Sequence, residues 1–116
     1  MSNDLFTRNY KDEFKQIFKE TLVISDPEQI KRIKANIKME ILGILKTQQS
    51  ERGMTIKEIS EKMKKNPGTV KYHIDELCEM NLLAIYNIEP THTGIVQKFY
   101  RLTFINLEIK ISEKLF

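Results

Sequence analysis

The stretch MTIKEISEKMKKNPGTVKYHIDELCEMNLL, residues 54–83, holds two short helical patterns separated by a turn. The first begins at Thr55, which forms a capping-box spacing with Glu58. Asn66-Pro67-Gly68 ends it, because proline disfavours a helical conformation in the residue before it. The second pattern runs from about residue 67 to residue 80. This stretch therefore predicts a helix–turn–helix.

The second predicted helix has an apolar side and an outer side. Val70, Ile74 and Leu77 fall on one side of a helix of about 3.6 residues per turn, with Cys78 beside them. The outer side carries Tyr72, a large ring that a core does not require there. This surface is either a solvated helix end or a surface that meets a partner, and we favour the partner. We read Cys78 as a buried, inert thiol.

The charges along this stretch are sorted. Lysines and no acids occur from residue 62 to residue 73, whereas acids and no bases occur from residue 74 to residue 80. The helix dipole alone could explain lysines where the first helix ends, but acids at the end of the second helix oppose the dipole and need another cause. A recognition helix places its N-terminal residues in the major groove of DNA. The residues we expect to contact DNA from the turn and this helix are Lys64, Lys65, Asn66, Gly68, Thr69, Lys71, Tyr72 and His73.

Arginine is the usual reader of guanine, and none occurs between residues 62 and 83. Sequence preference is then expected to rest on contacts of threonine and tyrosine with thymine methyl groups and on groove shape.

The flanking sequence completes a recognisable order of elements. Asp26, followed by Pro27, marks the start of a helix that Asn36 bends or divides. After residue 81 the pattern becomes β-rich, and residues 89–94, EPTHTG, separate two strands of a hairpin. Three helices followed by a hairpin are the layout of a winged helix-turn-helix. The expected DNA contacts of the wing are Thr91, His92, Thr93 and Lys98.

Both ends of the chain add to this layout. Aromatic residues recur at helical spacing near the N-terminus, and the stripe either caps its own core or packs against a second copy, which we favour. Apolar and polar residues alternate strictly from residue 105 to residue 112, which predicts a strand that pairs with residues 21–24 or extends the wing sheet. The residues of the stripe, expected at a dimer interface, are Phe6, Tyr10, Phe14 and Phe18.

Composition narrows the functional classes. The chain has 116 residues and a formal net charge of +3, which suits one small, mildly basic domain. A single cysteine provides neither a disulfide nor a thiolate metal cage. The sequence shows no nucleophile elbow, no phosphate-binding glycine loop and no spaced metal ligands, so we expect no enzyme, no cofactor and no metal. No apolar run approaches the roughly 18 residues of a membrane span, and we expect a cytoplasmic protein.

From about residue 24 to residue 102 the sequence resembles the ArsR-like winged helix-turn-helix transcription regulators. The likeness lies in ISDPEQIKRIKANIKMEILGIL, in residues 54–83 and in GIVQKFYRLT, the second wing strand. Two departures stand out: Ile37-Lys38 replaces the usual proline-arginine, and the paired cysteines of the metal-sensing members are lacking. The resemblance implies a homodimer that binds a palindromic operator on double-stranded DNA and usually represses.

Together these patterns predict an α+β, mostly α, fold: a three-helix core with a β-hairpin wing, an extra N-terminal helix and a C-terminal strand. We divide the chain into residues 1–25, a helix and short strand that could serve as a dimerisation arm, residues 26–103, the DNA-binding domain, and residues 104–116, a strand and tail. The predicted function is a sequence-specific transcriptional regulator. The alternatives are a winged-helix module that binds protein, or the N-terminal DNA-binding part of a longer regulator.

Overall fold

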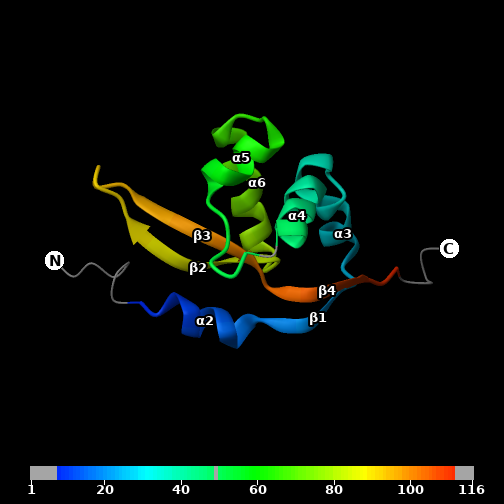
Figure 1. Cartoon of the computed structure of the whole chain (residues 1–116). Helices are drawn as coiled ribbons and strands as arrows, with labels where there is room; N and C mark the ends of the chain where they lie inside the picture. Colours follow the sequence, from blue (N-terminus) through cyan, green and yellow to red (C-terminus); the bar gives the residue numbers. More distant parts are fainter. Residues whose placement is uncertain (1–7, 49, 112–116) are drawn as a thin grey trace.

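The computed structural model describes residues 8–48 and 50–111. Figure 1 shows α3, α4, α5 and α6 on one side, the hairpin reaching out beside α6, and α2, β1 and β4 along the opposite side. The elements are α2 (Tyr10–Ile17), β1 (Lys19–Ile24), α3 (Pro27–Ile33), α4 (Asn36–Gln48), α5 (Ile56–Met63), α6 (Pro67–Glu79), β2 (Leu83–Pro90), β3 (Val96–Leu102) and β4 (Phe104–Ile109).

The helices begin where local sequence signals place them. Asp26 caps α3, with its side chain accepting a hydrogen bond from Glu28 N at 3.1 Å. Thr55 and Glu58 form both bonds of the predicted capping box at the start of α5. The first helical segment is divided between Ile33 and Asn36, as predicted. These boundaries were predictable because each depends on a few neighbouring residues.

The turn between α5 and α6 is short and tightly bonded. Lys64 adopts a left-handed conformation with φ 55°, an uncommon one for a residue with a β-carbon. Lys65 N donates to Ser60 O at 3.1 Å, which closes the end of α5. Asn66 then caps α6, and Pro67 is its first residue. The helix–turn–helix prediction is confirmed.

The wing is the antiparallel hairpin β2–β3. Its register pairs Leu83 with Leu102 and Pro90 with Val96. The body joins it through a β-bridge between Met54 and Tyr100. Gly53, at φ 85°, allows this approach, because a β-carbon there would lie 2.5 Å from Tyr100 O. The wing is thus fixed to the loop that precedes the helix–turn–helix.

The core lies between the helices and the base of the hairpin. Its side chains with no exposed surface come from α3, α4, α5, α6 and the segment that enters β2. Burying each such side chain stabilises the fold by roughly 1.5–3 kcal/mol. They are Ile33, Ile41, Ile59, Val70, Ile74, Leu77 and Leu82. Since three of them lie on α6, this helix can rotate little about its axis.

A second, smaller sheet joins the two ends of the described chain. Strand β1 pairs with β4 in parallel, with Leu22 opposite Leu107 and Ile24 opposite Ile109. Of the two pairings left open by the sequence, the structure has the one with residues 21–24. We call β1 and β4 together the arm. The arm lies along the side of the molecule away from α5 (Figure 1).

The aromatic stripe near the N-terminus is placed differently from our expectation. Tyr10 and Phe14 are buried in the chain's own fold, and the Phe14 ring packs edge-on against Tyr86 of β2 with centroids 5.3 Å apart. These two residues therefore follow the alternative in which the stripe covers the chain's own core, and not the dimer interface that we expected, because the outer face of the hairpin packs against them. Phe18 is half-buried, and Phe6 lies outside the described residues.

Candidate nucleic-acid interface

The N-terminal end of α6 is open to solvent. Asn66 Oδ1 accepts a hydrogen bond from Gly68 N at 2.7 Å, which orders the first turn. Thr69 and Lys71 are exposed, and Tyr72 is 61% exposed. Because Val70 and Ile74 are fully buried, the helix presents these polar and aromatic groups outward without local rearrangement. The sequence-predicted recognition surface is therefore accessible.

Lysines surround this end of the helix. Lys62, Lys64 and Lys65 are exposed, and none pairs with a carboxylate within the described part of the chain. Lys71 Nζ is 2.6 Å from Asp75 Oδ2, but this pair is exposed and one helical turn apart. Such pairs contribute little to stability and can be exchanged for a phosphate at small cost. The α6 dipole adds positive potential at the same end.

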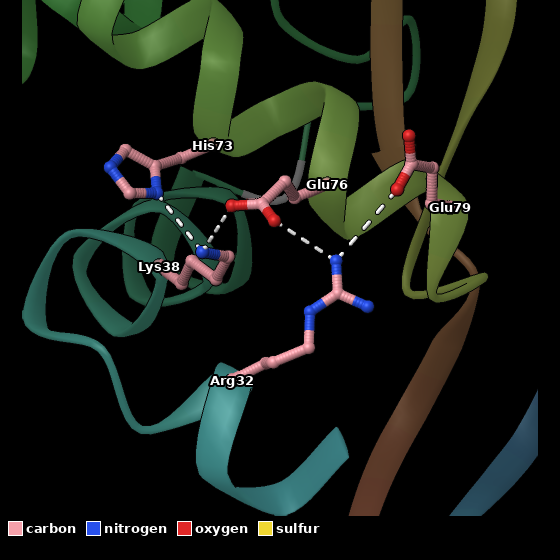
Figure 2. Close-up of polar contacts among 5 residues, drawn as sticks. All are labelled: Arg32, Lys38, His73, Glu76 and Glu79. Atoms are coloured by element: carbon pink, nitrogen blue, oxygen red, sulfur yellow. Dashed lines mark hydrogen bonds and ion pairs between the residues drawn. The ribbon is translucent and has the colours of Figure 1, made fainter. Parts of the chain in front are cut away.

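His73 does not share this exposure. Its ring is partly buried, and Nδ1 lies 3.1 Å from Nζ of Lys38 on α4. Lys38 is only 4% exposed, and its Nζ also donates to Glu76 Oε1 at 2.8 Å. Arg32 of α3 donates to the other oxygen of Glu76 at 3.0 Å and lies 3.7 Å from Glu79 Oε2. Figure 2 shows these side chains as one network between α6 and the helices beneath it.

The network explains the acids at the end of α6. They oppose the helix dipole, so the sequence alone leaves their cause open. The structure gives a cause for Glu76, whose pKa is held below its ordinary value by hydrogen bonds from Lys38 and Arg32. Glu79 is mostly exposed and only loosely paired. Among these acids, Glu76 is thus explained by contacts within the fold.

At the tip of the wing, two of the residues predicted to contact DNA bond within the turn itself. Thr91 Oγ1 donates to Ile95 O at 2.7 Å and lies 2.8 Å from Thr93 Oγ1. Thr91 N also donates to Ile95 O at 2.9 Å. These bonds fix the turn and leave His92 and Lys98 exposed. Ile95, which we did not single out, is 68% exposed at the same tip.

The sequence patterns did not assign a role to Lys38 or to Ile95. A signal for Lys38 was present, because Lys38, Ile41, Leu42 and Leu45 have the spacing of one helical face and the last three are apolar. Because burying a charge is costly unless it is paired, a lysine on the buried face of a helix predicts a hydrogen-bonding partner for its amine.

Cys78 has no sign of reactivity. Burial raises the pKa of its thiol to about 12, so almost none is thiolate near neutral pH. Among the residues that the structure describes, no group of three or more His, Cys, Asp or Glu side chains could hold a metal ion. In the same residues, no helix has the length and apolar character needed to cross a membrane.

The comparisons with known proteins agree with this geometry. Residues 36–83 match the family model described as winged helix-turn-helix DNA-binding. The matched segment contains α4, α5 and α6 and ends at the first residue of β2. A search of the curated proteins returned no match to the chain. The match covers the helices that carry the exposed cationic surface.

Proposed function

We propose that this chain, which carries a winged helix-turn-helix DNA-binding domain, is a sequence-specific transcriptional regulator of the ArsR-like type that binds a palindromic operator as a dimer and represses. The single observation that carries this proposal is the N-terminal end of α6. There Thr69 and Tyr72 face solvent beside Lys62, Lys64 and Lys65, which pair with no carboxylate in the described residues. That surface is suited to the major groove.

The contacts divide into positioning and reading. The lysines of the turn lie where phosphates flank a helix inserted in the groove, so they would supply salt-dependent affinity without sequence preference. Thr69 and Tyr72 lie on the side of α6 that would face the bases. Their methyl and ring groups suit contact with thymine methyls, and no arginine on α6 offers a bidentate contact to guanine. The operator is expected to be rich in A·T pairs at these positions.

The wing would make the second contact with DNA. His92 and Lys98 are exposed on it, and the internal bonds of Thr91 hold the tip in one conformation. The exposed Ile95 suits the wall of a minor groove, where apolar side chains commonly sit.

The arm supports the proposed dimer. A sheet of only two strands is marginally stable alone, and its open edges can pair with another chain. Large apolar side chains are exposed on or next to it at Ile17 (45%), Val23 (46%), Ile105 (49%) and Ile111 (55%). A second copy that covers them would place two recognition helices on one duplex. Tyr10 and Phe14 have no part in this interface, because they are already buried.

Salt-dependent DNA affinity tests the proposal. Fluorescence anisotropy with a labelled duplex, selected from a random library, should give an affinity that falls steeply as salt rises. The double variant Lys64→Ala/Lys65→Ala should bind all duplexes more weakly and lower the salt slope by about one charge for each lysine. Lys15→Ala is the control, because Lys15 is an exposed lysine of α2, and α2 lies on the side of the molecule away from α5 (Figure 1). Affinity that ignores salt, or an equal loss in the control, would contradict the proposal.

The dimer has its own test. Sedimentation of the wild type should show a dimer, and Ile105→Lys, which adds a charge to an exposed position of the arm, should shift it toward monomer. Footprints on the selected duplex should then shrink from two half-sites to one.

A protein-binding module is the second candidate. The observation that favours it is Tyr72, since exposed tyrosines are enriched in protein interfaces. In that case Tyr72→Ala would abolish a partner interaction that high salt leaves intact, and the lysine variants would have no effect.

A further inference from the structure

His73 lies at the boundary between the exposed and the buried side of α6. Its neighbour Tyr72 is exposed, and its neighbour Ile74 is fully buried. Nδ1 of His73 faces Lys38, at 3.1 Å from Nζ. In Figure 2 the other ring nitrogen, Nε2, points away from Lys38 and from the rest of the network. The two nitrogens of one ring therefore meet different surroundings.

Lys38 has little freedom to leave this contact. The residue is 4% exposed, so its amine has almost no access to water as an alternative partner. Glu76 holds the amine from a second direction at 2.8 Å, and Arg32 holds Glu76 in turn at 3.0 Å. A buried ammonium must keep its hydrogen-bond acceptors, because leaving them unmade is costly. His73 Nδ1 is one of these acceptors.

The contact decides where the proton of His73 resides. A lysine ammonium has three donors and no acceptor, so Nδ1 must accept and carries no proton. In the neutral ring the proton then lies on Nε2, on the outward edge. A second proton would place an N–H against the ammonium. The charged groups that face the ring are Lys38 from α4 and Glu76 from α6 itself, with Arg32 from α3 behind Glu76.

Burial and Lys38 act in the same direction on His73. Both lower the pKa of the ring, in that order, and outweigh the opposing effect of Glu76. Near neutral pH the ring is accordingly uncharged.

We propose that Lys38 is a positioning residue that holds His73 as a neutral Nε2–H donor, and that this donor bonds an acceptor on DNA, either a purine N7 or a phosphate oxygen. The DNA part of this inference rests on the proposed function. Major-groove N7 and phosphate oxygens both accept from such a donor. His73 would then recognise DNA by one directed hydrogen bond, and not by charge as the neighbouring lysines do.

The tautomer can be tested without DNA. Long-range ¹H–¹⁵N correlation spectra of the wild-type protein, with the ring assigned by His73→Gln, should show the proton on Nε2 and an unprotonated Nδ1. In Lys38→Met, which keeps much of the side-chain length, the bias toward Nε2–H should weaken and the His73 pKa should rise. Lys34→Met, the loss of an exposed lysine near the end of α3, should change neither.

A proton on Nδ1 in the wild type would overturn the inference. An unchanged His73 spectrum and pKa in Lys38→Met would overturn it equally.

DNA binding then tests the use of the donor. His73→Phe should weaken binding by about three- to tenfold, the worth of one ordinary hydrogen bond, with the salt slope unchanged because no counterion contact is lost. His73→Gln, which can still donate, should lose less. Duplexes with 7-deazapurines identify N7 as the acceptor, and methylphosphonate linkages identify a phosphate. The substituted duplex that weakens wild-type binding should leave the affinity of His73→Phe unchanged.

Two results would overturn this use of the donor. One is a salt slope that falls by about one charge in His73→Phe, which indicates a cationic contact. The other is that both modified duplexes change the affinity of the wild type and of His73→Phe to the same extent. The outcomes also separate the two proposals. If the wild type shows no salt-dependent DNA binding, the proposed function fails and the DNA contact fails with it. If DNA binds normally but the proton lies on Nδ1, only the present inference fails.

Discussion

The two halves of α6 carry opposite charges for different reasons. In the first half, residues 67–72, the side chains that are not buried face solvent, and the lysines nearby pair with no carboxylate or only with an exposed one. In the second half, residues 73–79, Glu76 is held by Lys38 and Arg32, and His73 is held by Lys38. A sorted charge pattern in a sequence can therefore combine a solvent-exposed cationic surface with a structural ion network.

This difference assigns separate roles to the two halves. The first half can exchange water for a ligand without loss of internal contacts. In the second half only the outward Nε2 of His73 can take a ligand, because removing any other partner of the network leaves a buried charge. If the division is correct, substitutions of exposed side chains in the first half should affect binding, and substitutions of Glu76 in the second half should affect the free energy of unfolding.

Ile74→Ala should show the largest effect, because the side chain is fully buried between α6 and the other helices. The lost burial and the cavity should lower the free energy of unfolding by about 2–5 kcal/mol. Urea denaturation followed by circular dichroism measures it. The matched comparison is Tyr72→Ala, two residues earlier and 61% exposed, which should lie within about 0.5 kcal/mol of the wild type. Equal losses in the two variants would remove the distinction between the halves.

Tyr72→Ala and Thr69→Ala should act on DNA recognition instead. Each should reduce discrimination between the preferred duplex and a duplex changed at one position by roughly 1–3 kcal/mol. The physical reason is loss of apolar contact with base edges, whereas the phosphate contacts of the lysines remain. Competition binding with single-position duplex variants measures the effect. Unaltered preference in Tyr72→Ala would show that the ring does not read bases.

The local part of this fold could be predicted from the sequence. The caps at Asp26 and Thr55 and the break at Asn66-Pro67-Gly68 depend on residues within three or four positions of one another. The orientation of α6 also followed from spacing, because Val70, Ile74 and Leu77 allow only one buried face. The exposure of Thr69 and Tyr72 is a direct consequence.

The contacts that were missed join residues far apart in the chain. Lys38 and Glu76 are separated by 38 positions, so nothing in the helical pattern of α6 shows that its acid has a buried partner. Likewise, the aromatic stripe gave no sign that Tyr86 and Arg101 of the hairpin would cover Phe14. Periodicity indicates which face of an element is buried but not what buries it.

Asn66→Ala should have an intermediate effect, because it removes the cap of the first half. Loss of the bond from Gly68 N should lower the free energy of unfolding by about 1 kcal/mol. Asn66→Asp is the sharper variant, because the carboxylate can still cap but adds a negative charge next to Lys65. Its free energy of unfolding in urea should be close to that of the wild type, but it should bind DNA more weakly at low salt. If Asn66→Asp lost as much free energy of unfolding as Asn66→Ala, the side chain of Asn66 would stabilise α6 by something other than this capping hydrogen bond.

The smallest effect should appear as a pH dependence of the second half. The His73 pKa is lowered from its ordinary value of 6.5 by burial and by Lys38, so the unfolded chain binds the proton more readily than the folded one. The stabilisation from this group is complete above about pH 6.5 and is lost as pH falls through the folded-state pKa. Urea midpoints of the wild type should therefore decline between about pH 7 and pH 5, and those of His73→Gln should decline less.

The pKa of Glu76 is lowered as well, by its bonds from Lys38 and Arg32, and the stabilisation from this carboxylate is lost only below its ordinary pKa of 4.5. A second decline in acid, retained in His73→Gln, would separate the carboxylate from the imidazole. Parallel curves for the two proteins above about pH 5 would contradict the placement of His73 against a buried ammonium.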